Sequence, residues 1–337
     1  MQAYIIRRVL LMIPTLLGIS ILVFTLTQTL PGGPVEQYIT KVQASLGASG
    51  SSSTHRITPE EYENIKKIYG YDKPAVSRYF HWISNALLFD FGYSYAYQEP
   101  VIDVIAERIP ISLFFGLTSF LISYLVCIPL GLKKARENQS KFDTISSGII
   151  FSGYVIPGYV LGMLLIVFLA GGSWLNIFPT DSVVSDEWEF LPWYAQVADF
   201  LHHMILPMTC YMASEFAFLT LLMKNSLLDE ISKDYLRTAV VKGAAFPTAV
   251  WKHALRNALI PIATRMSEIF TLMFAGALLI EKVFNIDGMG LLMYTAVYDR
   301  DYNVVMAIIF IVSTLALFGR LFSDLLYVWI DPRIRYE

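Results

Sequence analysis

The chain has 337 residues, of which 55% are hydrophobic and 16% are charged. Because a soluble domain typically carries about 25% charged residues, this composition predicts a membrane protein and argues against a soluble enzyme. The net charge of −3 gives no support to a nucleic-acid partner.

Six apolar runs have the length of a helix that crosses a bilayer, about 20 residues. They are Val9–Leu30, Pro110–Leu132, Ile145–Ala170, Met204–Met223, Ile262–Ile280 and Val304–Val328. Each run is expected to be helical, because unpaired backbone groups in lipid cost several kcal/mol. The sequence therefore predicts an all-α, polytopic membrane protein with about six transmembrane helices.

The first run follows Arg7 and Arg8, as a signal peptide would. It is long for such a peptide, no small-residue cleavage site follows it, and it ends at Pro31-Gly32-Gly33-Pro34. We therefore interpret residues 1–30 as a cytoplasmic end and a retained first span.

Residues 31–107 form the only soluble-looking segment, which we expect to be an extracytoplasmic lobe. Thr58 and Glu61 have the spacing of a capping box, Gly70 would end that helix, and a second amphipathic helix is expected at Ala75–Leu88. The rest of the chain is expected to form a core of five spans at 108–330, which includes a long loop at 224–261, and a cytoplasmic tail at 331–337.

Lysine and arginine gather in alternate connections between the spans. Those between spans two and three, and between four and five, carry Lys133, Lys134, Arg136, Lys141, Lys224, Lys233, Arg237, Lys242, Lys252 and Arg256. Residues 171–201 carry none but hold several acidic residues. The positive-inside rule then places both termini in the cytoplasm.

Charged residues inside the apolar runs need a partner or a function, because insertion of one costs about 2.5–3.5 kcal/mol. Arg265–Glu268 and Arg320–Asp324 have helical spacing for ion pairs. Glu215 has no such neighbour on its own helix, so it is expected to face a pathway or another span. The candidate pathway-lining residues are Ser214, Glu215 and Glu268.

The loop at 224–261 has the pattern of two short helices. Asp234 is expected to cap the first and Gly243 to end it, Pro247 to start the second and Pro261 to end that one. The residues that would form a compact docking surface are Asp234, Tyr235, Leu236, Arg237, Thr238, Ala239, Lys242, Gly243, Ala244, Ala245 and Phe246. A positively charged loop that only fixes topology is the alternative.

Several motifs resemble those of the oligopeptide/dipeptide family of ABC-importer permeases. Residues 234–239, Lys242-Gly243 and His253–Pro261 resemble the family's EAA loop, and Ile280–Phe284, Gly288-Met289-Gly290 and residues 331–336 resemble its later part. Tyr69–Pro74 and Leu191-Pro192-Trp193-Tyr194 are similar to the Yej-type branch. Gly33 and Val240 depart from residues common in the family.

This resemblance implies a MetI-like permease fold in a bacterial inner membrane. It further implies a second similar permease subunit, a cytoplasmic ABC ATPase that receives the loop, an extracytoplasmic peptide-binding protein and a peptide cargo. We expect no cofactor and no metal in this chain. The Walker A pattern does not occur in the sequence, so ATP and magnesium would be bound by the partner ATPase.

Three other functions are alternatives to ATP-driven peptide import. An ion-driven transporter would show inverted repeats or broken helices, and no repeat is evident. An intramembrane protease would need a Ser/His or Asp pair inside the spans, which the sequence does not provide. A permease for nickel or another small solute remains an alternative, although the spans lack a His/Cys/Met cluster.

Overall fold

The computed structural model describes residues 2–29, 73–171, 174–266 and 268–330. Within these ranges the regular structure is helical, with one isolated β-bridge between Tyr93 and Pro100. Residues 30–72, which include the expected Thr58 helix and most of the predicted outer lobe, lie outside the described residues, as does the tail at 331–337.

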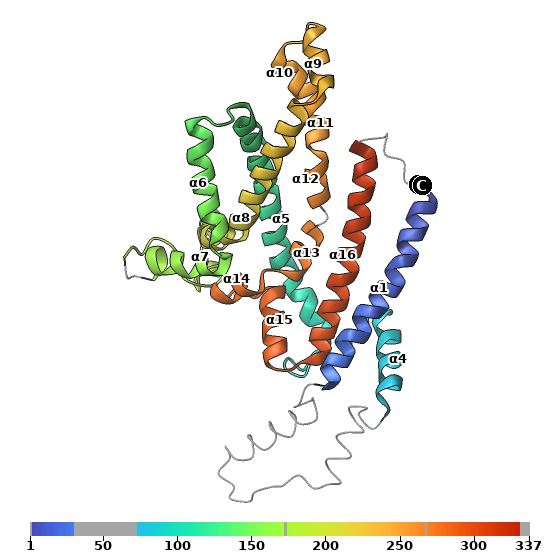
Figure 1. Ribbon diagram of the computed structural model, residues 1–337. Coiled ribbons are helices and arrows are strands. Elements are labelled where there is room, and N and C mark those ends of the chain that lie inside the picture. Colours follow the sequence, from blue (N-terminus) through green and yellow to red (C-terminus); the bar gives the residue numbers. More distant parts are fainter. Residues whose placement is uncertain (1, 30–72, 172–173, 267, 331–337) are drawn as a thin grey trace, which may run out of the picture. The chain divides into compact units, whose positions relative to one another are not determined.

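The helices follow one another in chain order (Figure 1). They are α1 Gln2–Thr29, α4 Ala75–Ala86, α5 Val101–Arg136, α6 Lys141–Val155, α7 Gly158–Leu165, α8 Trp193–Ile231, α9 Asp234–Val241, α10 Phe246–Ala249, α11 Leu255–Ala258, α12 Ile260–Arg265, α13 Glu268–Ala275, α14 Leu278–Val283, α15 Met289–Tyr298 and α16 Tyr302–Ile330. Short non-α turns at Ile166–Ala170, Trp188–Phe190 and Val250–Ala254 adjoin α7, α8 and α10.

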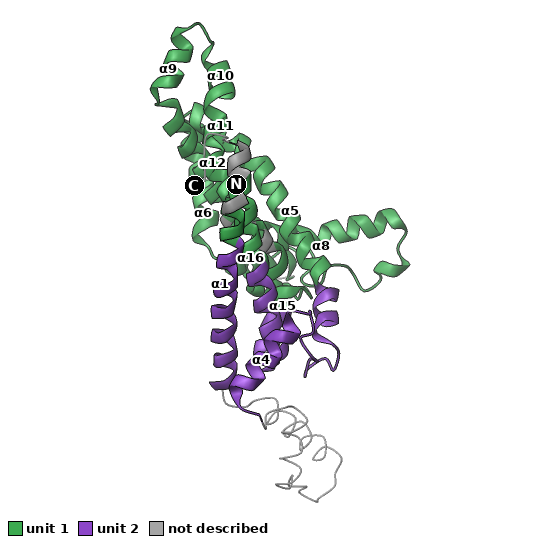
Figure 2. Cartoon of the chain, turned by 90° about the vertical axis from the view of Figure 1, so that its right-hand side faces the viewer, with its two compact units in different colours: residues 1–8, 109–291, 315–337 green, residues 9–108, 292–314 purple. Residues whose placement is uncertain are grey.

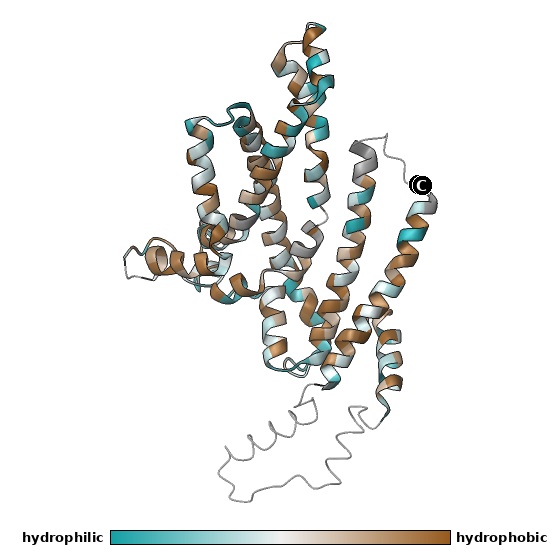
Figure 3. Ribbon diagram, viewed as in Figure 1, coloured by the Kyte–Doolittle hydropathy of each residue, from teal (hydrophilic) through white to brown (hydrophobic). Residues whose placement is uncertain are grey.

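Three helices are long and apolar enough to cross a membrane alone: Tyr4–Thr29, Val101–Arg136 and Tyr302–Leu325. Two bent pairs raise the number to as many as five among the described residues, at Lys141–Ala170 and Trp193–Ile231. The prediction of an all-α, polytopic membrane fold is confirmed. Figure 3 shows hydrophobic residues along most of these helices and hydrophilic ones at the α5–α6 connection.

The bend of 96° between α6 and α7 has a local cause. Ile156 adopts an extended conformation, with ψ at 119°, immediately before Pro157. A residue that precedes proline is sterically disfavoured from the helical region. The third apolar run therefore forms two helices at a sharp angle.

The fifth apolar run, Ile262–Ile280, does not form one helix, and that prediction was wrong. The run is divided among α12, α13 and α14, with a break at Gly276, whose φ is +65°. A Cβ at this position would also lie 2.2 Å from Oε1 of Glu281. Glycine is required there for both reasons, and an apolar pattern alone does not reveal either.

The chain divides into two compact units (Figure 2): residues 1–8, 109–291 and 315–337 form unit 1, and residues 9–108 and 292–314 form unit 2. In unit 2, α4 occupies the place of the predicted second outer helix. Tyr79 and Ser20 hydroxyls lie 2.9 Å apart, and the Trp82 ring meets the edge of Phe310. The predicted boundary near residue 108 falls inside α5.

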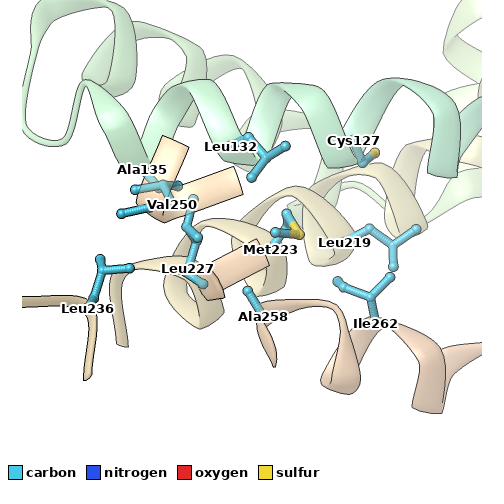
Figure 4. Packing of buried hydrophobic residues seen from close by; sticks show 12 residues of the cluster. Cys127, Leu132, Ala135, Leu219, Met223, Leu227, Leu236, Val250, Ala258 and Ile262 are labelled. Atoms are coloured by element: carbon cyan, nitrogen blue, oxygen red, sulfur yellow. The ribbon is translucent and has the colours of Figure 1, made fainter. Parts of the chain in front are cut away.

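The core of unit 1 joins α5, α8 and the segment from α9 to α12 (Figure 4). Its buried members are Cys127, Leu132, Ala135, Leu219, Met223, Leu227, Leu236, Ala249, Val250, Ala254, Ala258 and Ile262. Close approach of α5 to α8 depends on Gly131, because a Cβ there would lie 2.6 Å from Cβ of Met223. Apolar packing thus contributes to holding the long helices to the short ones.

Gly131→Ala should therefore destabilise the protein by about 1–3 kcal/mol, the usual cost of overpacking. Thermal unfolding of the detergent-solubilised chain measures this as a lower Tm. Gly148→Ala is the matched control, because a Cβ at Gly148 would meet nothing within 4 Å. Equal melting temperatures for the two variants would contradict the packing at Gly131.

Candidate functional site

The α9–α10 knob, residues 234–258, is a compact group of short helices, α9, α10 and α11, that follows the end of α8. The α9 helix ends at Val241 with Lys242 as its C-cap, and Gly243 follows with φ at +95°, a conformation that glycine adopts without strain. The α10 helix begins at Phe246, with Pro247 in its first turn. The structure thus contains the first predicted helix, while the second, expected at 247–261, is divided into α10, a π-helical turn at Val250–Ala254 and α11.

Two of the expected helix boundaries were wrong. Asp234 does not cap α9, since Lys233 occupies the N-cap position and no side chain caps that helix. Pro261 does not end a helix either. It lies in the first turn of α12, where backbone N–H groups have no intrahelical acceptor, so a proline there costs no hydrogen bond.

The knob is anchored to the end of α8 through α9 and α11. The Leu236 side chain, only 2% exposed, packs in the core of unit 1. The buried Glu230 carboxylate accepts hydrogen bonds from Lys233 Nζ, from Tyr235 OH at 2.5 Å and from Asn257 Nδ2 at 3.3 Å. These contacts fix α9 and α11 to α8.

Burial, together with the neighbouring Glu230 carboxylate, raises the pKa of Tyr235 to about 12. The phenol therefore remains a hydrogen-bond donor throughout the physiological pH range. Tyr235 was predicted as a docking residue, and that role stays a prediction; in the structure its hydroxyl bonds to Glu230 inside the knob. The sequence pattern does not predict the cluster around Glu230, because Asn257 is distant from Glu230 along the chain.

The outer surface of the knob combines exposed apolar side chains with cationic ones. Val241 is 87% exposed, and Val240 and Phe246 are also exposed. The other predicted residues at the surface are Asp234, Arg237, Thr238, Lys242, Gly243 and Ala245, while Ala239 and Ala244 are half-buried against the core. An apolar patch with a polar rim is typical of a protein–protein contact.

A second candidate site lies at an ion pair inside the apolar runs. Arg265 Nη2 lies 3.5 Å from Oε1 of Glu215, and the Arg265 guanidinium lies 4.4 Å from the centre of the Phe218 ring. Glu215 thus faces another helix, as one of its two expected placements requires. The side chains of Ser214 and Glu268 lie outside those that the structure describes. The pathway-lining role of these two residues and the expected pair of Arg265 with Glu268 therefore stay predictions.

The Glu215–Arg265 pair borders a cavity of about 50 Å³. Its lining residues are Ser119, Phe120, Ser123, Tyr124, Tyr211, Glu215, Leu219, Arg265 and Ile269. Only Glu215 among them was a predicted site residue. The others come from α5, α8, α12 and α13, and their sequence spacing does not indicate that they meet.

A third polar cluster was not foreseen. The Glu281 carboxylate is fully buried and accepts hydrogen bonds from Tyr211 OH at 2.8 Å, Ala277 N at 3.1 Å and Leu291 N at 2.8 Å. Ser112 Oγ accepts a further bond from Met289 N at 2.7 Å. The one local signal is the set of glycines at 276, 288 and 290. The first two lack side chains that would clash with the carboxylate, and Gly290 allows close approach to the backbone of Leu278.

At the end of α16, Asp324 accepts a hydrogen bond from Tyr4 OH at 2.8 Å and lies 2.9 Å from Nη2 of Arg8. Its expected pairing with Arg320 stays a prediction. The contact connects the first residues of the chain to its last described helix, both within unit 1.

Comparison with known proteins covers the whole chain. Residues 127–336 match the family model "Binding-protein-dependent transport system inner membrane component", and residues 1–116 match the N-terminal model of the same kind of component. The chain is 41% identical to the peptidoglycan transport system permease protein YejB of Agrobacterium fabrum, over 100% of this chain and 99% of that protein.

Two further relatives match over the full length of both chains. They are the inner membrane ABC transporter permease protein YejB of Escherichia coli O157:H7, at 40% identity, and the oligopeptide transport system permease protein AppB of Bacillus subtilis, at 34%. The matches agree with the resemblance found in the motifs, the Yej-type branch included.

Tyr235→Phe should loosen α9 because it removes a hydrogen bond to a charged acceptor, which is worth about 1.5–3 kcal/mol. Hydrogen exchange measures this as amide exchange at residues 234–241 that is faster by about tenfold or more. Thr238→Ala is the control, because the Thr238 hydroxyl bonds only within its own helix, to Asp234 O. Unchanged exchange in Tyr235→Phe would contradict the anchoring role of Glu230.

Proposed function

The chain belongs to the family of binding-protein-dependent transport system inner membrane components, and on this premise we propose that it is the permease subunit of an ATP-driven peptide importer. It would form half of the translocation pathway, beside a second, similar permease subunit. The chain would make and break no covalent bonds, and its activity would be a change between two arrangements of its helices.

The α9–α10 knob supports this proposal most directly. Its exposed Val241 and Phe246 offer an apolar surface to a partner, while Leu236 and Glu230 hold it to the long helices. A partner that moves the knob therefore moves α8 with it. We propose that the partner is a cytoplasmic ABC ATPase, which carries ATP and magnesium, and that this chain needs no cofactor of its own.

The remaining partners follow from the same proposal. An extracytoplasmic binding protein would deliver peptide to the opposite face of a bacterial inner membrane, with both chain termini in the cytoplasm. The names of the relatives mention peptidoglycan and oligopeptides, and both kinds of molecule contain amide-linked amino acids. Peptide is therefore a better-supported cargo than nickel.

An ion-driven transporter is the second candidate, because the structure contains the broken helices that such a protein would show. The breaks lie between α6 and α7 and between α13 and α14. Membership in a binding-protein-dependent family favours ATP as the energy source, and the knob has no role in an ion-driven mechanism.

Val241→Asp tests the docking surface. This side chain is exposed, so the substitution should leave the fold intact and place a charge in an apolar contact, which we expect to lower ATPase binding by about tenfold or more. Co-purification of the ATPase with the permease, and peptide-stimulated ATP hydrolysis, are the measurements.

Asn138→Asp, an equal charge change at an exposed position between α5 and α6, is the control. It should leave both measurements unchanged. If wild-type protein retains no ATPase and uptake follows an ion gradient instead, the ion-driven candidate replaces the proposed function.

A further inference from the structure

The cavity beside Glu215 and Arg265 holds a charge pair that is open to a ligand. The 3.5 Å between the two side chains exceeds the 2.7–2.9 Å of a well-formed charge-assisted hydrogen bond. Both side chains are partly exposed, Glu215 by 37% and Arg265 by 29%. A small polar group can thus reach either charge.

The same cavity contains a buried hydroxyl without a hydrogen-bond partner among the described residues. Ser123 lines the cavity, is 2% exposed, and its Oγ has no hydrogen-bond partner among the described residues. Buried polar atoms without a partner are uncommon in folded proteins. An acceptor or donor that enters the cavity would satisfy this hydroxyl.

The surrounding side chains favour a cation next to Glu215. The rings of Phe120 and Tyr124 line the cavity with centroids 4.1 Å apart, and aromatic faces attract ammonium groups. Arg265 is held against Phe218, so its position is restrained while Glu215 accepts a second cation. The cavity therefore offers a carboxylate acceptor, a guanidinium donor and a hydroxyl within one small space.

We propose that this cavity binds the free amino-terminal residue of the transported peptide. Glu215 accepts hydrogen bonds from the α-ammonium group, and Arg265 and Ser123 donate to the first carbonyl oxygen. This inference rests on the proposed function and names the part of the peptide that the cavity binds.

The geometry fits this ligand in charge and in size. In any peptide the α-ammonium and the first carbonyl flank a single α-carbon, so they are adjacent, as are Glu215 and Arg265. A cavity of about 50 Å³ accommodates a few non-hydrogen atoms but not a whole peptide. Because the proposed contacts involve only main-chain groups of the peptide, the site can bind peptides of any sequence. The small number of contacts keeps binding weak enough for the release that transport requires.

The test is uptake into proteoliposomes that hold the complete importer, with tetra-alanine as the probe. Its three forms have a free amino terminus, an acetylated amino terminus, or a free amino terminus with an amidated carboxyl terminus. Glu215→Gln should lower uptake of both forms with a free amino terminus by about tenfold, the effect of one lost charged hydrogen bond. Uptake of the acetylated form should not change.

The comparison of variant with wild type keeps the binding protein constant, so any preference of that protein cancels. Glu137→Gln, an exposed carboxylate between α5 and α6, is the matched control and should not alter uptake. Uptake is expressed per assembled complex, which separates a folding defect from a binding defect. Equal losses for free and acetylated peptide would overturn the proposed subsite and leave peptide import standing.

If the wild-type importer takes up none of the three forms, peptide import itself fails. A second measurement needs no binding protein: thiol labelling of Ser123→Cys in the purified complex. Millimolar free tetra-alanine should slow this labelling, and the acetylated form should not. Equal labelling rates with both forms, or protection that is lost only when the carboxyl terminus is amidated, would overturn the proposal.

Discussion

A break in a membrane helix frees backbone N–H groups that lipid cannot satisfy, and in unit 1 the Glu281 carboxylate satisfies them. It accepts bonds from the N–H group of Ala277, at the break between α13 and α14, from the N–H group of Leu291, in the first turn of α15, and from the Tyr211 hydroxyl. Gly276 supplies the space and the positive φ. This one side chain thus allows the fifth apolar run to bend instead of crossing as a rod.

The same constraint explains why the polar side chains in unit 1 occur in clusters. Lys134 is fully buried, yet its ammonium contacts Asp143, Ser146 and Ser147, and Asp143 in turn lies 2.7 Å from Nζ of Lys224. A buried charge with several partners is tolerated, whereas a buried charge without a partner is costly. This cluster ties α5 and α6 to α8.

The α8 helix connects the two candidate sites physically. Glu215 lies immediately after the bend of 46° in this helix, and Glu230 lies in its final turn, where it holds Tyr235. A continuous helical segment from Glu215 to Ile231 therefore links the cavity to the knob. Rigid elements of this kind can carry a movement at one end to the other, which is the arrangement that ATP-driven gating needs.

The sequence by itself determined the membrane class, the long helices and the turn between α9 and α10, because apolar run length, Gly243 and Pro247 act locally. It also indicated the family, through motifs along the whole chain. The break at Gly276, the meeting of Glu215 with Arg265 and the clusters around Glu230 and Glu281 were decided only by the tertiary structure. Their partners are distant along the chain, and only packing shows which buried polar groups have found one another.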